Sequence, residues 1–389
     1  MSVKRPIYLD CNATTPVSPE VLKAMLPFFT DYFGNPSSLN HSYGWEAEAG
    51  IDKAREILAA AIAATPSAIV FTSGATEANN LAIKGIAEAY MSKGKHIITV
   101  QTEHNSVLDP CRYLETLGFN ITYLPVQPDG LIDLAKLENA FQEETILVSV
   151  MAANNEIGVL QPVEQIGEVC HERNVIFHTD AAQALGKITL NVERMNVDLL
   201  SMTAHKLYGP KGIGALYVRR KNPRVQLASQ LHGGGQEKGL RSGTLYTPQI
   251  VGFGEAVRIA TAEMESETQR LRALRDRLWD QLRELPGVHL NGHLTQRLPN
   301  NLNVSIEGVK GSALLSGVRD VIAISSGSAC SSTNPAPSHV IKALGRSDEL
   351  ARATIRFGLG HTTCEADIER AATIVREQIR TLRKRKVSV

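Results

Sequence analysis

The chain has 389 residues, 43% of them hydrophobic and 21% charged, which is the composition of an ordinary globular protein. Its 41 Lys and Arg against 40 Asp and Glu give a net charge of +1, which provides no electrostatic footprint for nucleic acid or an anionic membrane. No apolar run approaches the ~18 residues that a membrane span needs. The N-terminus lacks the apolar stretch of a secretory signal, and the five scattered cysteines form no C-x-x-C pair, so we expect a cytoplasmic protein.

The first two thirds of the chain predict an α/β fold. Helices are expected at 18–33 and at about 42–64, before the first strand of the sheet. Short β-rich runs then follow at 68–72, 96–101, 119–125, 145–151, 175–180, 197–203 and 213–220. Helical stretches lie between the earlier ones, at 76–91, 106–117, 133–142 and 163–172. This alternation predicts a mainly parallel central sheet sandwiched by helices, which binds ligands at the carboxyl ends of its strands.

A second, smaller domain is predicted at the C-terminal end. Residues 263–285 are densely charged with Leu and Trp at helical spacing, as expected for a long amphipathic surface helix. We place the domain boundary there, with a large domain at 1–262 and a small α+β domain at 263–389. Strands are expected at 299–308 and 321–329, and helices at 338–345 and 365–385. The N-terminal segment is expected to pack with the small domain.

Two reactive side chains are expected at neighbouring strand ends. The strand 175–180 ends on Asp180, and the strand 197–203 ends just before Lys206. Both side chains can therefore reach the same edge of the sheet. A lysine there can form a Schiff base, and a carboxylate can keep a pyridine nitrogen protonated, a pairing that indicates pyridoxal phosphate. Taken singly, a surface lysine and a helix-capping aspartate are the simpler interpretations.

The stretch FTSGATEANN at 71–80 indicates a phosphate site. A strand runs through Ser73 to Thr76 into a helix, so backbone N–H groups and a hydroxyl meet the positive end of a helix dipole. The same residues would also serve as an ordinary helix N-cap. The loop alone does not separate the two interpretations.

Other motifs exclude several enzyme classes. KGIGAL lacks the third glycine of a dinucleotide fingerprint, no G-x-x-x-x-G-K-[ST] occurs, and HGGG at 232–235 has no G-x-S-x-G partner. The histidines show neither H-x-x-x-H nor H-E-x-x-H spacing. We therefore expect no intrinsic metal.

One cysteine stands apart from the others. The segment SSGSACSSTNPAPS at 325–338 sets Cys330 among Ser, Gly, Asn and Pro, which neither helix periodicity nor strand alternation organises. It has neither the apolar neighbours of a core thiol nor a second cysteine nearby. Such a loop offers little packing and much backbone freedom, which suits an exposed thiolate nucleophile.

Motifs along essentially the whole chain resemble those of the NifS/IscS-type cysteine desulfurases, which are class-V aminotransferase enzymes with the pyridoxal phosphate (PLP) fold type I. The longest are YLDCNATTPVSPEV, FTSGATEANNLAIKG, TEHNSVLDPCR, NNEIGVLQP, HTDAAQALGK, SMTAHKLYGPKGIGALYVRR, HGGGQEKGLRSGT, SSGSACSS and IRFGLG. The resemblance implies a PLP-dependent transferase, with the cofactor bound by the domain 1–262 and a catalytic Cys loop in the small domain. Thr203 stands where many relatives carry Ser, which preserves the hydroxyl.

The resemblance also implies a role for each matching residue. Lys206 holds the cofactor covalently, Asp180 pairs with the pyridinium nitrogen, and Gln183 donates to the ring oxygen. His104 stacks on the ring and takes part in proton transfer, although spacing alone indicates an ordinary strand-end histidine. The phosphate-binding positions are Ala75, Thr76, Thr203, His205 and, across a dimer interface, Thr244. The substrate-carboxylate positions are Asn155, which is also counted with the cofactor site, and Arg356, for which a domain-closing salt bridge is the alternative.

The implied activity is conversion of L-cysteine to L-alanine with a persulfide formed on Cys330. The sulfur would serve iron–sulfur cluster assembly through an acceptor such as a scaffold protein, and also tRNA thiolation. The resemblance further implies a homodimer, and Cys330 would contact an iron–sulfur cluster only transiently. Two alternatives stay open: an aminotransferase or lyase in which Cys330 is incidental, and a non-catalytic sulfur-transfer partner, in which the cofactor residues would be idle.

Overall fold

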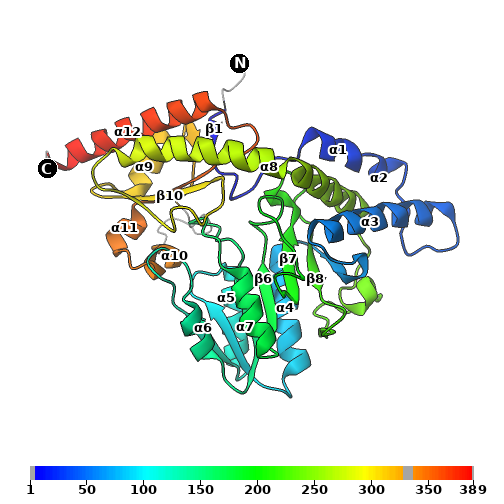
Figure 1. Cartoon of the computed structure of the whole chain (residues 1–389). Helices are drawn as coiled ribbons and strands as arrows, with labels where there is room; N and C mark the ends of the chain where they lie inside the picture. Colours follow the sequence, from blue (N-terminus) through cyan, green and yellow to red (C-terminus); the bar gives the residue numbers. More distant parts are fainter. Residues whose placement is uncertain (1–4, 327–335, 388–389) are drawn as a thin grey trace.

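The large unit is built around a seven-stranded sheet (Figure 1). The computed structural model describes residues 5–326 and 336–387. The strand order is β2-β8-β7-β6-β5-β3-β4, and all neighbouring pairs are parallel except those of β8. The strands are β2 (Ile69–Thr72), β3 (His96–Val100), β4 (Asn120–Leu124), β5 (Thr145–Ser149), β6 (Ile176–Asp180), β7 (Leu199–Thr203) and β8 (Gly214–Val218). This confirms the predicted α/β fold with a mainly parallel sheet.

Helices bury both faces of this sheet, so every residue of its strands other than β4 is buried, without alternation. One face is covered by α4 (Ala75–Tyr90) and α5 (Asn105–Thr116). The other face packs against α3 (Ser42–Ala61), α6 (Leu134–Ala140), α7 (Val163–Glu172) and the first half of α8 (Thr247–Arg283). Cys111 and Cys170 are buried in these two layers as small core residues.

The prediction of a single helix at 18–33 is wrong. The structure divides it into α1 (Pro19–Met25) and α2 (Pro27–Thr30). Pro27 has no backbone N–H and its ring clashes with the carbonyl one turn earlier, so the helix breaks at this residue.

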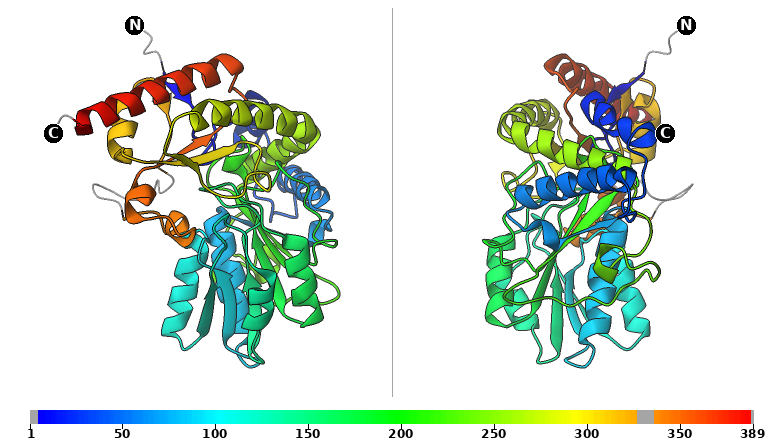
Figure 2. Two further views of the ribbon diagram at one scale, coloured as in Figure 1. Left: turned by 60° about the vertical axis from the view of Figure 1, so that its left-hand side comes forward. Right: turned by 90° about the vertical axis from the view of Figure 1, so that its right-hand side faces the viewer.

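The smaller unit has a second sheet. Its antiparallel order is β12-β10-β9, and a parallel pair, β1-β11, ties the N-terminal segment to it. The strands are β1 (Ile7–Tyr8), β9 (Val288–Leu290), β10 (Asn301–Ile306), β11 (Ile322–Ala323) and β12 (Thr354–Gly358). The helices are α9 (Gly311–Val318), α10 (His339–Ala343), α11 (Asp348–Arg352) and α12 (Glu365–Val387). In Figure 2, α12 lies beside the second half of α8.

The helix predicted at 263–285 is longer than expected. It begins at Thr247, and its first half is buried with Ile250 and Phe253 in the large core. Its second half packs with Leu271 and Leu278 in the small core. The early part has no amphipathic pattern, because it is apolar and rich in small residues. The two cores meet between Ala260 and Leu271, and we propose residue 262 as the boundary between the domains. In the described part of the chain, no helix has the length and apolarity needed to cross a membrane.

The contact between α3 and α8 gives a test of this packing. A Cβ added at Gly254 would lie 2.8 Å from both Cα and Cβ of Ala54. Because backbone cannot move aside as a side-chain tip can, Gly254→Ala should lower the free energy of unfolding by about 1–3 kcal/mol. In an open helix position the same change would stabilise by ~1 kcal/mol.

Urea denaturation of both proteins measures this difference. The matched control is Ala273→Gly, at an exposed position of α8, which should lose only the ~1 kcal/mol of helix propensity. A gain in stability for Gly254→Ala would contradict the close approach of the two helices.

Candidate active site

One cavity of about 520 Å³ lies at the carboxyl ends of β6 and β7. The structure brings together in its walls the predicted residues Ala75, Thr76, His104, Asn155, Asp180, Gln183, Thr203, His205, Lys206 and Arg356. Thr244 does not line this cavity and is exposed. Cys330 lies outside the described residues.

Lys206 ends a short 3-10 turn, Ala204–Lys206, that directly follows β7. Its Nζ donates to the carbonyl oxygens of Asn12 at 2.5 Å and Ala13 at 2.7 Å. Burial, and next the charge of Arg356, lower the pKa of Lys206 from 10.5 to about 7. A large part of this amine is therefore neutral, and nucleophilic, at neutral pH.

Asp180 ends β6 with both carboxylate oxygens occupied. Oδ1 accepts from the backbone N–H of Ala182 at 2.8 Å, and Oδ2 accepts from Nδ2 of Asn79 at 2.7 Å. Gln183 is held by Asn12, since its Nε2 donates to the Asn12 carbonyl at 2.9 Å and its Oε1 accepts from Asn12 Nδ2 at 3.1 Å. These bonds fix the orientation of the carboxylate and the amide at the cavity wall.

His104 is the N-cap of α5, because its Nδ1 accepts from the backbone N–H of Ser106 at 3.1 Å. Burial is the main cause of a lowered His104 pKa. His205 accepts or donates at Nδ1 with the Thr14 hydroxyl, at 3.1 Å, and burial lowers its pKa to about 4. Both imidazoles are therefore neutral at pH 7.

The first turn of α4 lies where the phosphate site is predicted. Gly74 precedes it at φ 151°, a value that favours glycine, and it offers no capping side chain. Ala75 and Thr76 line the cavity at this helix N-terminus, where the dipole favours an anion. The Ser73 N–H is taken by the carboxylate of Glu77, at 2.7 Å, and so does not serve the cavity. Of the backbone N–H groups expected at the phosphate site, that of Ser73 is therefore not available.

Arg356, on β12, joins the small sheet to the cavity. Its Nη1 donates to the Asn155 carbonyl at 2.9 Å, and its Nη2 pairs with Asp10 Oδ1 at 2.8 Å. The domain-closing salt bridge considered as an alternative role is therefore present. The buried Nε of Arg356 has no hydrogen-bond partner among the described residues, which leaves one donor for a bound carboxylate.

Three residues of this site, the buried Asn12 and Asn79 and the partly buried Asp10, were not found from the sequence. Asn12 binds both Lys206 and Gln183, Asp10 pairs with Arg356, and Asn79 holds Asp180. The motifs DCNATTP and TEANN contain them, but an asparagine in a loop or helix has many structural uses. Only the three-dimensional contacts distinguish them.

The comparisons with known proteins agree with this geometry. The aminotransferase class-V model matches residues 7–371, and the chain belongs to this family, which confirms the prediction made from its motifs. A protein of Methylobacillus flagellatus named cysteine desulfurase IscS is 55% identical over 384 residues, 98% of this chain and 94% of that protein. A cysteine desulfurase IscS of Neisseria meningitidis is likewise 55% identical over 98% of the chain, and 94% of that protein is covered.

Solved structures give the same result. A structure described as a NifS-like protein superposes with a TM-score of 0.88 at 38% identity, and the match covers 97% of this chain and 99% of that one. The structure of SspA in complex with cysteine matches with a TM-score of 0.80 at 41% identity, over 91% of this chain and 98% of that one.

The family uses pyridoxal phosphate, and the residues of the cavity fit this group. The partly neutral amine of Lys206 suits its aldehyde, and the anchored carboxylate of Asp180 suits a pyridinium N–H. The N-terminus of α4 suits its phosphate. The three groups line one cavity, so a single molecule can meet all of them.

The lowered pKa of Lys206 gives a prediction on pH. Uptake of pyridoxal phosphate requires the neutral amine, so its rate in the cofactor-free protein should rise with pH through a midpoint of about 7, not 10.5. Stopped-flow absorbance of the bound cofactor measures this midpoint. Arg356→Gln should move the midpoint upward, because the charge of Arg356 is the second cause of the lowered pKa. Lys206→Arg, which stays charged, should abolish covalent uptake, and a wild-type midpoint near 10 would contradict the assignment.

Proposed function

We propose that this chain is a cysteine desulfurase that converts L-cysteine to L-alanine and transfers the sulfur to Cys330 as a persulfide. The carrying observation is that Lys206, Asp180 and His104 meet at one cavity, which Arg356 also lines. The names of the relatives support the same activity, and SspA supports cysteine as the substrate. We also propose iron–sulfur cluster assembly as the destination of the sulfur, through a scaffold protein, and tRNA thiolation as a second one.

Each residue of the cavity has a separate role in this reaction. Pyridoxal phosphate, when bound, supplies an electron sink for the bonds at the substrate's Cα. Arg356 and Asn155 orient the substrate carboxylate, and Asp180 and Gln183 orient the cofactor ring. Lys206 holds the cofactor and, once released as a neutral amine, takes the Cα proton on Nζ.

The sulfur step is assigned to Cys330. Its thiolate attacks the Sγ atom of the substrate, so an S–S bond forms as the Cβ–Sγ bond breaks, and the electron pair of the broken bond stays on the carbon fragment. Protonation of that fragment leads to alanine. A thiol reductant then releases the transferred sulfur as sulfide, which regenerates the Cys330 thiol at the expense of two electrons.

Substitution of Cys330 tests this function. Cys330→Ala should abolish formation of alanine and sulfide from L-cysteine with dithiothreitol, because no thiolate takes the sulfur. The visible absorption of the bound cofactor should stay as in the wild type. The matched control is Cys364→Ala, which removes an exposed thiol at the start of α12 and should keep full turnover.

Retained turnover in Cys330→Ala would refute the desulfurase. Transfer of an amino group from L-cysteine to a keto acid, without sulfide, would instead indicate an aminotransferase. Loss of the visible band from purified wild-type protein would favour a non-catalytic role.

We also propose that the chain works as a homodimer. An exposed apolar patch extends over α1, α2 and the start of α3, and consists of Leu26, Phe29, Phe33, Leu39, Tyr43, Trp45 and Tyr246. Phe33 is 63% and Leu39 67% exposed, which is unusual for a surface left in water. Tyr246 contacts Phe29 and follows Thr244 by two residues. The patch therefore extends to Thr244, the residue assigned to the cofactor phosphate that is bound by the second copy of the chain.

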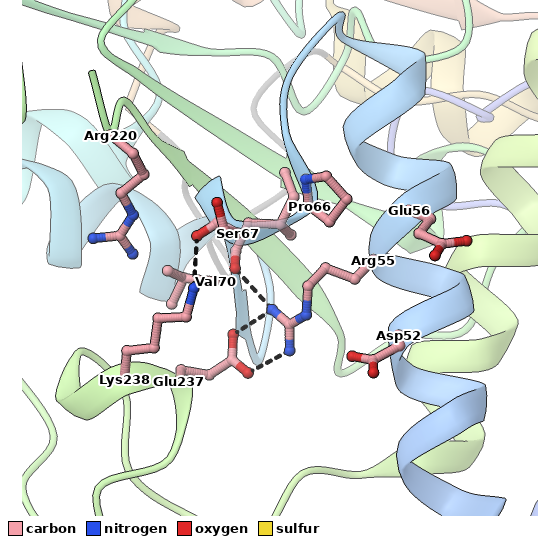
Figure 3. Close-up of a pocket in the computed structure, with 10 residues that line it drawn as sticks. Asp52, Arg55, Glu56, Pro66, Ser67, Val70, Arg220, Glu237 and Lys238 are labelled. Atoms are coloured by element: carbon pink, nitrogen blue, oxygen red, sulfur yellow. Dashed lines mark hydrogen bonds and ion pairs between the residues drawn. The ribbon is translucent and has the colours of Figure 1, made fainter. Parts of the chain in front are cut away.

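The loop that carries Thr244 is held firmly. Figure 3 shows Glu237 reaching Arg55 of α3, with Oε1 and Oε2 at 2.7 and 3.0 Å from the two guanidinium nitrogens. Glu237 Oε2 also accepts from the N–H of Phe71 on β2, at 2.8 Å. Glu237 and Lys238 have φ of 50° and 59°, which costs about 1–3 kcal/mol each. The buried ion pair offsets this strain and fixes the direction in which the chain leaves toward Thr244.

Mixed dimers test the shared site. Thr244→Ala should weaken pyridoxal phosphate binding about tenfold, because one hydrogen bond to a charged phosphate is lost. In a mixed dimer of Lys206→Ala and Thr244→Ala chains, one site has both wild-type residues if Thr244 acts across the interface. That site should bind the cofactor with wild-type affinity, as measured by titration of the absorption band. Affinity as weak as in the Thr244→Ala homodimer would show instead that Thr244 acts within its own chain.

A further inference from the structure

A chain of hydrogen bonds runs along the wall of the cavity from Asp180 to His104. Nδ2 of Asn79 lies 2.7 Å from Oδ2 of Asp180 and 2.8 Å from Oγ of Ser106. Oγ of Ser106 lies 2.8 Å from Nδ1 of His104. Asn79 is fully buried and Ser106 is 7% exposed, so water competes little with these bonds. Two groups assigned to the bound cofactor, one to its pyridinium nitrogen and one to the face of its ring, are thus connected through α4 and the start of α5.

The donors and acceptors allow this chain only one direction. The carboxylate of Asp180 accepts, so the amide of Asn79 donates one hydrogen to it and the second to Ser106 Oγ. An amide rotated by a half turn would set its oxygen against the carboxylate. The Ser106 hydroxyl, having accepted from Asn79, has its own hydrogen left for Nδ1 of His104.

The backbone adds a second group that can only donate. The N–H of Ser106 also points to Nδ1 of His104, at 3.1 Å. Two donors therefore meet at Nδ1, which leaves it without a proton of its own. In a neutral imidazole the remaining proton is then on Nε2, the nitrogen not engaged by α5.

The surroundings favour the neutral ring. His104 caps the N-terminus of α5, where the helix dipole opposes a positive charge. Burial is the largest cause of its lowered pKa; Lys206 and His339 lower the pKa further, and Asp180 and Asp109 raise it. The two carboxylates face His104 but do not outweigh the other effects.

We propose that Asn79 and Ser106 are positioning residues that lock His104 as a neutral imidazole with its single N–H on Nε2, as a hydrogen-bond donor toward the bound cofactor and substrate. The inference rests on the proposed function for the role of His104 and makes it more specific. A ring fixed in this way accepts a proton only at Nδ1, against two donors. His104 therefore orients and stabilises bound groups by donation, and removal of the substrate's proton falls to Lys206.

Nitrogen NMR of the full-length protein with ¹⁵N-labelled histidine tests the tautomer directly. His104→Gln identifies the resonances, and spectra are recorded with and without pyridoxal phosphate. In both states Nδ1 should show the shift of an unprotonated ring nitrogen and Nε2 that of a protonated one. A proton on Nδ1 at pH 7 would overturn the proposal. The measurement needs no turnover, so it stands even if the protein fails to desulfurate L-cysteine.

Variants of Ser106 test whether its hydroxyl sets the protonation state of His104. Ser106→Ala removes one donor to the neutral ring, so the pKa of His104 should rise by about half to one pH unit. The acid limb of the kcat profile with L-cysteine should move to higher pH by the same amount. Ser106→Thr keeps the hydroxyl and should restore both values, which a purely structural role would not require.

A second buried serine serves as the matched control. Ser149 Oγ lies 2.8 Å from Nδ1 of His178, inside the sheet, and neither residue lines the cavity. Ser149→Ala removes a bond of the same kind and length, and should lower thermal stability without moving the His104 resonances or the pH profile. An unchanged His104 pKa in Ser106→Ala, or an equal change in Ser149→Ala, would refute the role of Ser106.

Discussion

The segment Leu9–Thr15 is the constraint on which both the fold and the site depend. Its backbone pairs with Gly358 of the small sheet on one side and with His205 of the large unit on the other. Between these contacts, the carbonyl of Asn12 accepts from the amine of Lys206. A side chain at Gly358 would lie 2.7 Å from the backbone nitrogen of Asn12, so only glycine permits this approach. The N-terminal segment thus joins the two cores at the point where the reactive amine is held.

Burial, more than pairing with opposite charges, sets the protonation of this site. Desolvation is the first cause of the lowered pKa values of Lys206, His205 and His104. In water Lys206 would be a cation at neutral pH, and the two histidines would become cations just below it. In the protein each of the three is held by neutral hydrogen-bond partners. The cavity therefore offers nucleophilic and donor groups without excess positive charge. The formal charges that remain at its wall belong to Asp180, Glu77, Arg356 and Lys211.

Much of this arrangement can be predicted from the amino-acid sequence. Strand ends in a parallel sheet converge on one edge, which is enough to place Asp180 and Lys206 together. The contacts of Asn12 and Asn79 cannot be predicted in this way, because an amide reveals its partners only when distant segments meet. The break at Pro27 is a local effect of proline that the apolar periodicity of 18–33 conceals. The first half of α8 escapes prediction because most of its surface is buried, which leaves only a weak amphipathic signature.

The length of α8 has a mechanical consequence. At 1.5 Å per residue its 37 residues form a helix about 55 Å long. Its first half is packed in the large core and its second half in the small core. Rotation of one core against the other would bend this helix and break the contact of Gly254 with α3. It would also disrupt the segment that carries Asn12. The two cores should therefore tumble as a single rigid body, and the width of the cavity should be nearly the same before and after a small molecule enters it.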